Sequence, residues 1–268
     1  MISARTLGLV GAGGVNQSFV ARMPALLARL GPVKGSSLRV SRRIANGFRS
    51  GTAVARYADL AACESIWISV PDELLDRTIS GLADEISLHG KNVVLCEVLR
   101  DSASATELRA AGARVATLNS VPKSGERLFV AEGNAVVVAG LRKRLALDGR
   151  KLIELLPGAK SLYWLGIHMG SHMLVPWIEG ATRSLRAAGW SRMEATQLVQ
   201  ALGRDVLRGY ASAGERVVNP EDARRLRRIV EAELTAITVK DSMLADLFMS
   251  APKRARGERY PVMKAKAG

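Results

Sequence analysis

The sequence is poor in aromatic residues, cysteine and histidine, and it has no long hydrophobic run. Aromatic residues make up 4% of its 268 residues, and it contains two cysteines and three histidines. No apolar stretch approaches the roughly 20 residues that a membrane-spanning helix needs, so we expect no membrane partner. Cys63 and Cys96 lie in or beside apolar runs, which favours buried thiols over a disulfide framework. Asn16 and Gln17 follow the first apolar run and favour a strand and turn over a signal peptide, so we predict a cytoplasmic protein.

Acidic residues are the scarcer charged class. The chain has 39 Lys and Arg against 25 Asp and Glu, a formal net charge of +14. Such a charge is compatible with nucleic-acid binding, which remains an alternative through the basic tail and Arg224–Arg228. A run such as "ARRLRR" is more typical of a solvated helix face, so nucleic acid is not the partner that we expect.

Short apolar runs alternate with helical patterns up to about residue 160. The runs that we predict as strands are apolar at nearly every position, which is typical of strands buried on both faces of a parallel sheet. The intervening segments carry apolar residues at spacings of three and four, as amphipathic helices do. The pattern predicts an α/β fold with a doubly wound parallel sheet, of the Rossmann type, over residues 1–158. The predicted strands are "TLGLVG", "SLRVS", "SIWISV", "NVVLCEV", "RVATLNSV" and "AVVVAG", and the helices between them include "PDELLDRTISGLADEI" and "RKRLALDGRKLIELL".

Strand patterns stop after Pro157, and the rest of the chain is predicted to be helical. A long helix is expected over residues 161–188, kinked at Pro176. Ser191 and Glu194 form a capping-box pattern, and Asn219 followed by Pro220 is a second strong helix start. We therefore predict an all-helical domain over residues 159–251 and a basic, flexible tail over residues 252–268.

A glycine-rich turn follows the first predicted strand. In dinucleotide-binding folds such a turn and the next helix N-terminus face the pyrophosphate. Gly11 would permit the tight turn and Gly13 the close approach of the phosphate, while Asn16 stands where a third small residue is usual. A simple glycine turn is the alternative interpretation. The predicted cofactor-binding residues here are Gly11, Ala12, Gly13, Gly14, Val15 and Asn16.

The end of the second predicted strand indicates which dinucleotide is bound. NAD-specific sites place an acidic residue there, but the sequence has no acid between Gly11 and Asp59. Ser41, Arg42 and Arg43 take that place instead, and guanidinium groups bind a 2′-phosphate well. We therefore predict NADP as the cofactor; solvated arginines remain the alternative.

The strand "SIWISV" runs into a helix start at Pro71. Its carboxyl end would border the ligand crevice, so Ser69, Val70 and Pro71 are further predicted cofactor contacts.

Several of these segments together resemble a known family. In order they are "GLVGAGGVNQSF", "SRR", "IWISVPDELL", "AEGNAVVVAG" and "SLYWLGIHMGSHMLVPWIEGATRSLRAAG". They resemble Rossmann-like proteins with a C-terminal helical domain of unknown function, relatives of pyrroline-5-carboxylate reductase, ketopantoate reductase and 6-phosphogluconate dehydrogenase. The resemblance implies NADP binding in the first domain, a helical domain like that of 6-phosphogluconate dehydrogenase, a homodimer formed through that domain, and a site in the cleft between the domains.

The chain departs from that family at positions that bear on catalysis. Relatives usually carry Ser-Gly after the fifth strand and His-Pro after the sixth, where this chain has "CEVLRDS" and "LNSVPKSGERLF". Their central helix reads Tyr-His and later Ser-Asn, whereas this one has Tyr163-Trp164 and Ser171-His172. Cofactor binding is less sensitive to these changes than the catalytic group is.

Four residues are the predicted catalytic candidates. His168 and His172 lie four apart, so both should project from one face of the central helix and titrate in a useful range. Asn119 and Lys123 lie at or after the carboxyl end of a predicted strand. Each could instead have a structural or solvated role, and Tyr163 and Ser171 are further possible donors. The two helix histidines lack an evident third ligand, so we expect no metal.

Together these features predict an NADP-dependent oxidoreductase that reduces a small imine or keto acid by hydride transfer in the interdomain cleft. The alternative is a catalytically silent protein that binds NADP as a sensor or scaffold.

Overall fold

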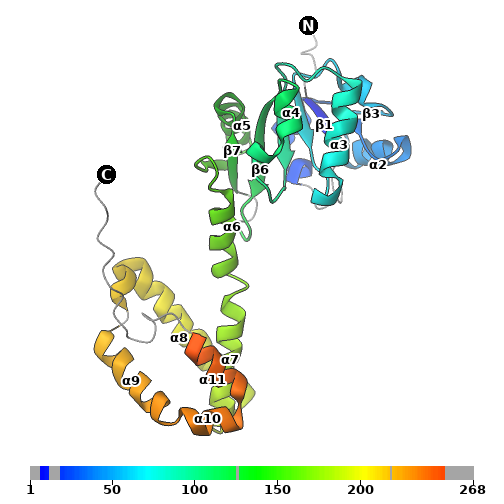
Figure 1. Ribbon diagram of the computed structural model, residues 1–268. Helices are drawn as coiled ribbons and strands as arrows, with labels where there is room; N and C mark the ends of the chain where they lie inside the picture. Colours follow the sequence, from blue (N-terminus) through cyan, green and yellow to red (C-terminus); the bar gives the residue numbers. More distant parts are fainter. Residues whose placement is uncertain (1–6, 12–18, 125–126, 218, 251–268) are drawn as a thin grey trace, which may run out of the picture. The chain divides into compact units, whose positions relative to one another are not determined.

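The computed structural model describes residues 7–11, 19–124, 127–217 and 219–250. The chain divides into two compact units, Met1–Gly166 and Ile167–Gly268. The first unit is built on one sheet with helices on both faces, and the described part of the second unit is helical (Figure 1).

The sheet of the first unit has eight strands in the order β3-β2-β1-β4-β5-β6-β7-β8. Neighbouring strands are parallel except β6 and β7, which pair antiparallel. From β1 the chain moves outward to β2 and β3, then crosses back to β4 on the other side of β1. The strands are β1 (Leu7–Val10), β2 (Leu30–Lys34), β3 (Thr52–Val54), β4 (Ser65–Ile68), β5 (Asn92–Cys96), β6 (Arg114–Ser120), β7 (Leu128–Gly133) and β8 (Lys151–Glu154).

Two hydrophobic clusters cover the two faces of this sheet. Successive side chains of a strand point to opposite faces, so Trp67 of β4 belongs to one cluster while Ile66 and Ile68 belong to the other. Burial on both faces explains why β1, β4 and β5 are apolar along almost their whole length. The first cluster includes side chains of α1 (Pro24–Leu27), α2 (Leu38–Phe48) and α5 (Ala135–Leu147), and the second those of η2 (Tyr57–Leu60), α3 (Asp72–Glu85) and α4 (Thr106–Ala110).

The second strand lies earlier than predicted. The segment "SLRVS" is not a strand: Ser37 caps α2, its Oγ accepting a hydrogen bond from the backbone N–H of Val40 over 3.3 Å. The second strand is instead β2. It contains Gly31 and Pro32, residue types that usually interrupt a strand. A register shift between β1 and β2 accommodates them, because Leu7 pairs with Leu30 but Leu9 pairs with Val33.

The end of the first unit also differs from the prediction. The segment "AVVVAG" begins α5 instead of forming a strand, because the Asn134 side chain accepts hydrogen bonds from the N–H groups of Val136 and Val137. The strand that precedes it, β7, runs antiparallel to β6, so the sheet is not parallel throughout. The helix predicted over residues 142–156 ends at Leu147, and β8 follows.

The second unit begins within α6, and the long predicted helix is interrupted directly after α6. The interruption, at residues 170–173, precedes Pro176, which lies in the first turn of α7 where a missing N–H costs little. The predicted helix starts are confirmed: Ser191 and Glu194 form a capping box, and Asn219 caps a helix that begins with Pro220. The helices are α6 (Lys160–Met169), α7 (Leu174–Ala187), α8 (Arg192–Ala213), α9 (Pro220–Ala232), α10 (Leu234–Lys240) and α11 (Ser242–Ser250).

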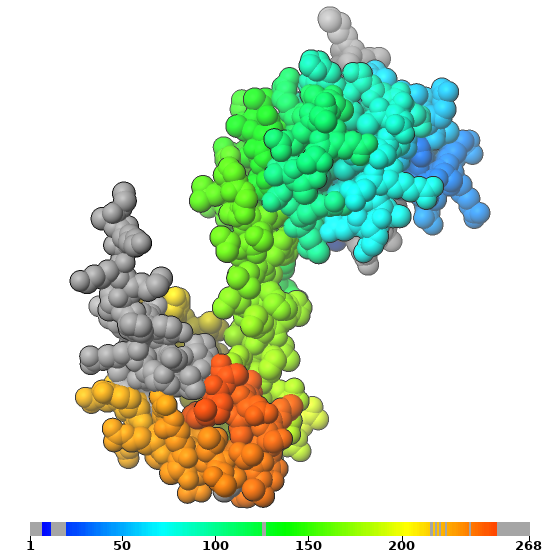
Figure 2. All heavy atoms as spheres, in the orientation of Figure 1, coloured from blue at the N-terminus to red at the C-terminus, as the bar shows by residue number. Residues whose placement is uncertain are grey.

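Helices α7 and α11 pack closely within this unit. A Cβ on Gly180 of α7 would lie 2.4 Å from the side chain of Leu247 in α11, so glycine permits the contact. Figure 2 shows α11, in red, against the yellow-green α7.

Cys63 and Cys96 are both buried and unpaired, as predicted. Burial raises the pKa of each thiol. In the described part of the chain no helix has the length and apolar character needed to cross a bilayer. A cytoplasmic location stays a prediction.

Candidate functional site

A pocket of about 900 Å³ opens at the carboxyl ends of β1, β2 and β4. The strand order reverses here, because β2 and β4 lie on opposite sides of β1, and ligands of open α/β sheets bind at such points. The volume is in the range of small-molecule and cofactor sites. The pocket is lined by Val10, Gly11, Lys34, Gly35, Ser36, Tyr57, Val70, Leu74, Arg77, Thr78, Ser80, Gly81 and Asp84.

Gly11 lies in the wall of this pocket directly after β1. Its N–H donates a hydrogen bond to the carbonyl of Lys34 over 2.8 Å, and its φ of 71° lies in the left-handed region. A Cβ here would lie 2.4 Å from the carbonyl oxygen of Ser69 and 2.7 Å from Val70 Cγ1. Glycine therefore keeps β1 and β4 close at the mouth of the pocket.

The other predicted cofactor contacts of this region divide into two groups. Ser69, Val70 and Pro71 follow β4 as predicted, and Val70 lines the pocket. The remaining turn residues lie outside the described part of the chain; they are Ala12, Gly13, Gly14, Val15 and Asn16.

The prediction that Ser41, Arg42 and Arg43 end a strand is wrong. They lie in the second turn of α2, with Arg42 and Arg43 exposed and Ser41 fully buried. Ser41 Oγ accepts a hydrogen bond from the N–H of Gly35 over 2.8 Å and donates to the carbonyl of Val54. The serine thus shapes the turn after β2, while Lys34, Gly35 and Ser36 supply that side of the pocket.

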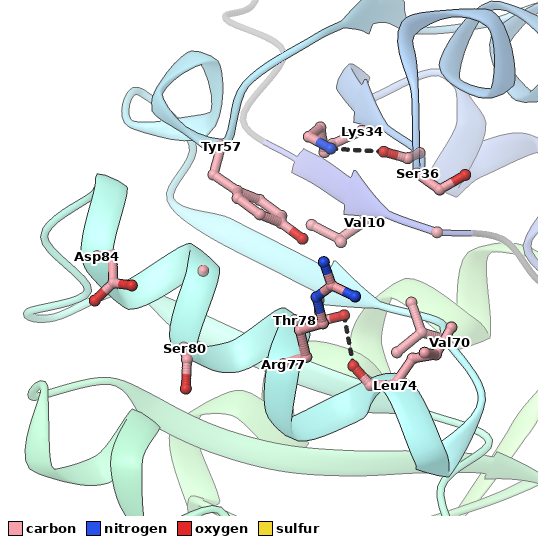
Figure 3. Close-up of a pocket in the computed structure, with 13 residues that line it drawn as sticks. Val10, Lys34, Ser36, Tyr57, Val70, Leu74, Arg77, Thr78, Ser80 and Asp84 are labelled. Atoms are coloured by element: carbon pink, nitrogen blue, oxygen red, sulfur yellow. Dashed lines mark hydrogen bonds between the residues drawn. The ribbon is translucent and has the colours of Figure 1, made fainter.

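The pocket carries two cations and one carboxylate on its described lining. Lys34 Nζ lies 4.7 Å from the centroid of the Tyr57 ring and donates to the carbonyl of Gly35. Arg77 points from α3 into the pocket, toward Val10 and the ring of Tyr57 (Figure 3). Asp84 is the acidic lining residue, on a later turn of α3. This balance favours a ligand that carries negative charge.

Tyr57 forms an apolar wall of the same pocket. Its ring lies against Gly81, where a Cβ would be 3.0 Å from Cε2 of the ring. The small residue on α3 lets the edge of the ring approach the helix, which leaves a ring face available to a planar group.

Asn119 lies at the same edge of the sheet, at the end of β6. It is 1% exposed; its Nδ2 donates to the carbonyl of Val98 over 2.9 Å, and its Oδ1 has no partner among the described residues. Lys123 follows in the next loop, exposed and with a φ of 62°.

His168 and His172 lie near each other in the second unit, but they do not share one helix as predicted, because α6 ends at Met169 and His172 lies in the interruption at residues 170–173. Their ring centroids are 5.5 Å apart, and Nδ1 of His172 lies 3.2 Å from Ser171 Oγ. Both side chains are exposed. The two histidines therefore lie near each other in the second unit, whereas Asn119 belongs to the sheet of the first unit.

Sequence reasoning missed Lys160, the first residue of α6. It is 1% exposed, and its Nζ donates to the carbonyl of Arg100 over 2.9 Å. Burial lowers the pKa of Lys160 to about 8. Nearby carboxylates, of which Glu132 has the largest effect, raise this pKa but do not offset the burial. Glu132, also buried, accepts hydrogen bonds from Ser102 and Thr117. A single lysine in an apolar helix start gave no signal of this environment.

No protein-family model matches the sequence, and no curated protein matches it. Solved structures with a similar fold do match it. The imine reductase from Bacillus cereus is 18% identical with a TM-score of 0.64, covering 91% of this chain and 90% of its own. The structure described here therefore has the same fold as that imine reductase, a Rossmann fold followed by a helical domain. The predicted fold class is therefore confirmed.

Two further imine reductases were solved with ligands. One, from Aspergillus terreus in complex with NADPH4 and a dibenzazepine, is 18% identical with a TM-score of 0.61 and covers 97% of this chain and 90% of its own. The other, a Myxococcus stipitatus variant in complex with NAD+, is 15% identical with a TM-score of 0.62 and covers 94% and 95%.

Proposed function

We propose that the protein is an NADP-dependent oxidoreductase that reduces a small imine or keto acid. The observation that carries this proposal is the pocket at the β1, β2 and β4 ends, with Gly11 in its wall and Lys34 and Arg77 on its lining. The imine reductases of the same fold support the reaction class. When bound, the nicotinamide would supply the hydride.

The residues present fit the adenosine half of such a cofactor. Tyr57 offers a ring face, and Gly11 and Val70 bring the backbone of β1 and β4 to the pocket mouth. The described end of β2 has no carboxylate to accept hydrogen bonds from a ribose hydroxyl; Lys34 and Ser36 offer donors instead. We propose that these donors, with Arg77, bind the 2′-phosphate and favour NADP over NAD.

His168, His172 and Lys123 remain candidates for proton supply, and Asn119 for orienting the substrate. Among the described residues no group of three or more His, Cys, Asp or Glu side chains is placed to hold a metal ion, so none enters the proposal.

The competing proposal is a sensor or scaffold that binds NADP without turnover, motivated by the altered segments after β5 and β6. Calorimetric titration with NADPH, followed by NADPH oxidation assays with pyruvate and methylpyrroline, separates the two. Binding with oxidation supports the reductase, binding without oxidation across a wider panel of imines and keto acids supports the sensor, and no binding contradicts both.

We also propose that the protein forms a homodimer through its helical unit. Large apolar side chains of α7 and α8 are exposed in the single chain, from 38% for Trp177 to 68% for Leu207. A second copy would remove this surface from water. Sedimentation of the wild type and of a Leu207→Glu variant tests this: the variant should be monomeric, and a monomeric wild type would contradict the proposal.

A further inference from the structure

Residues 97–100, directly after β5, join three other elements at the carboxyl edge of the sheet. Glu97 Oε1 accepts a hydrogen bond from the N–H of Ser120 over 2.8 Å, and the carbonyl of Val98 accepts one from Asn119. The N–H of Leu99 donates to Asp72 Oδ2 over 3.2 Å. The carbonyl of Arg100 accepts from Lys160 Nζ. The end of β6 and the first residues of α3 and α6 are therefore held around one short segment.

Four residues of this edge have polar atoms that are buried and have no hydrogen-bond partner among the described residues. Two are acceptors, Asp72 Oδ1 and Asn119 Oδ1. Two are donors on α6, the hydroxyl of Tyr163 and Nε1 of Trp164, whose rings have centroids 4.9 Å apart. Buried polar groups are normally satisfied, so this concentration of unused donors and acceptors points to a ligand.

This edge is also where the reacting end of a dinucleotide belongs. In the proposed function the pocket described above would take the adenosine half between β2 and β4, and Gly11 and Val70 line that pocket where the strand order reverses. A dinucleotide crosses a doubly wound sheet at that point, so its nicotinamide would lie toward the ends of β4, β5 and β6.

We propose that Tyr163 is the proton donor of the reduction and that its hydroxyl binds the substrate atom that is to be protonated. The inference rests on the proposed function. An imine nitrogen or carbonyl oxygen supplies the acceptor that the hydroxyl lacks, while Asn119 Oδ1 accepts an N–H from the ligand. The hydride of NADPH goes to the substrate carbon, the π pair goes to nitrogen or oxygen, and that atom takes the phenolic proton. The cofactor is oxidised to NADP+, the substrate is reduced, and water reprotonates the phenolate.

The surroundings of Tyr163 suit a donor. Burial, with the charge of Glu97, raises the pKa of its hydroxyl, so the proton is present at neutral pH. Trp164 cannot release its indole proton, and Lys160 already donates to Arg100. Four carboxylates at this edge act on Lys160, namely Glu132, Asp72, Asp101 and Glu97, and of these Glu97 also acts on Tyr163.

The first test compares Tyr163→Phe with Tyr210→Phe, an exposed tyrosine of α8. We expect kcat for NADPH oxidation with pyruvate or methylpyrroline to fall about 100-fold or more in the first variant and to be unchanged in the second. NADPH affinity should be equal in both. A kcat within about threefold of wild type in Tyr163→Phe would overturn the proposal.

The pH profile separates Tyr163 from the other donors, with pyruvate as the substrate because it does not titrate in this range. If Tyr163 donates, kcat falls only above about pH 10, the usual pKa of a tyrosine. A fall near pH 8, where Lys160 titrates, or near about pH 6.5, where an unperturbed histidine titrates, would overturn the assignment.

A binding measurement decides the matter without turnover. Pyrrolidinone, a lactam whose carbonyl accepts a hydrogen bond, is titrated by calorimetry into NADP+-loaded wild type, Tyr163→Phe and Tyr210→Phe. We expect Tyr163→Phe alone to bind it about tenfold more weakly. Equal affinity in all three, or no binding to any, would overturn the role of Tyr163. A wild type that oxidises no NADPH while this difference holds would overturn the proposed function and leave the hydroxyl as a ligand contact.

Discussion

The hydroxyl of Ser41 accepts a hydrogen bond from the backbone N–H of Gly35 over 2.8 Å and joins α2 to the turn that lines the pocket. Ser41→Ala leaves that buried N–H without its acceptor. We expect the free energy of unfolding to fall by about 1–3 kcal/mol in urea denaturation. Arg42→Ala, an exposed neighbour on the same helix, is the control and should change it by less than about 0.5 kcal/mol. Equal effects of the two substitutions would contradict this role of Ser41.

Gly11→Ala should destabilise the fold and abolish NADPH binding. The new Cβ would lie 2.4 Å from the carbonyl oxygen of Ser69, at a backbone conformation that alanine tolerates poorly. The matched control is Gly140→Ala in α5, where a Cβ meets nothing within 4 Å. That control should stabilise the protein by about 0.5–1 kcal/mol, because alanine favours a helix. Thermal unfolding and calorimetry measure both effects, and a stable Gly11→Ala variant that binds NADPH would disprove the close packing described here.

Glu132→Gln should destabilise the first unit. Glu132 Oε2 accepts the hydroxyl of Ser102, while Oε1 accepts the Ser102 N–H and the Thr117 hydroxyl. An amide nitrogen in place of one oxygen cannot accept, so at least one buried donor loses its acceptor, at a cost of about 1–3 kcal/mol. Glu154→Gln, which breaks an exposed pair with Arg142, should cost less than about 1 kcal/mol. Urea denaturation that ranks the two substitutions in the opposite order would refute this.

Lys160 should make stability rise with pH in the alkaline range. Its pKa is lowered from 10.5 in the unfolded chain to about 8 in the folded protein. Between these values the unfolded state binds more protons, so the free energy of unfolding increases as pH rises from about 8 to 10.5. The expected gain is on the order of 2–3 kcal/mol, and Lys160→Met should lack it. The measurement is the difference between wild-type and variant unfolding curves, and a difference that does not change over this pH range would show that Lys160 is not desolvated.

The sequence predicted the fold class and most of the central strands because these depend on local hydrophobic pattern. It misplaced β2 because Pro32 lies in a strand whose register shift is a property of its pairing with β1. It misread the start of α5 because the cap by Asn134 outweighs the β-propensity of three successive valines. The first error is a tertiary effect, whereas the second reflects a local cap, since Asn134 accepts from N–H groups only two and three residues away.

The sequence likewise predicted only part of the candidate site. Gly11 and Val70 were predicted at the edge of the ligand crevice, and both line the pocket, because turn chemistry after a strand is local; their contact with a cofactor stays a prediction. Lys34, Tyr57 and Arg77 come from three separate segments and meet only through the order of the strands. The environments of Lys160 and Tyr163 depend on residues that follow β5, which no spacing along the chain reveals.

Calorimetric titration of NADPH and NADH into the wild type, Lys34→Ala, Arg77→Ala and Arg43→Ala tests the central claim most directly. We predict that the wild type prefers NADPH and that losing either pocket cation weakens NADPH binding by about tenfold or more. NADH binding should change less in Lys34→Ala, and Arg43→Ala should match the wild type for both dinucleotides. Binding of neither dinucleotide to the wild type, or loss of NADPH preference in Arg43→Ala alone, would contradict the account.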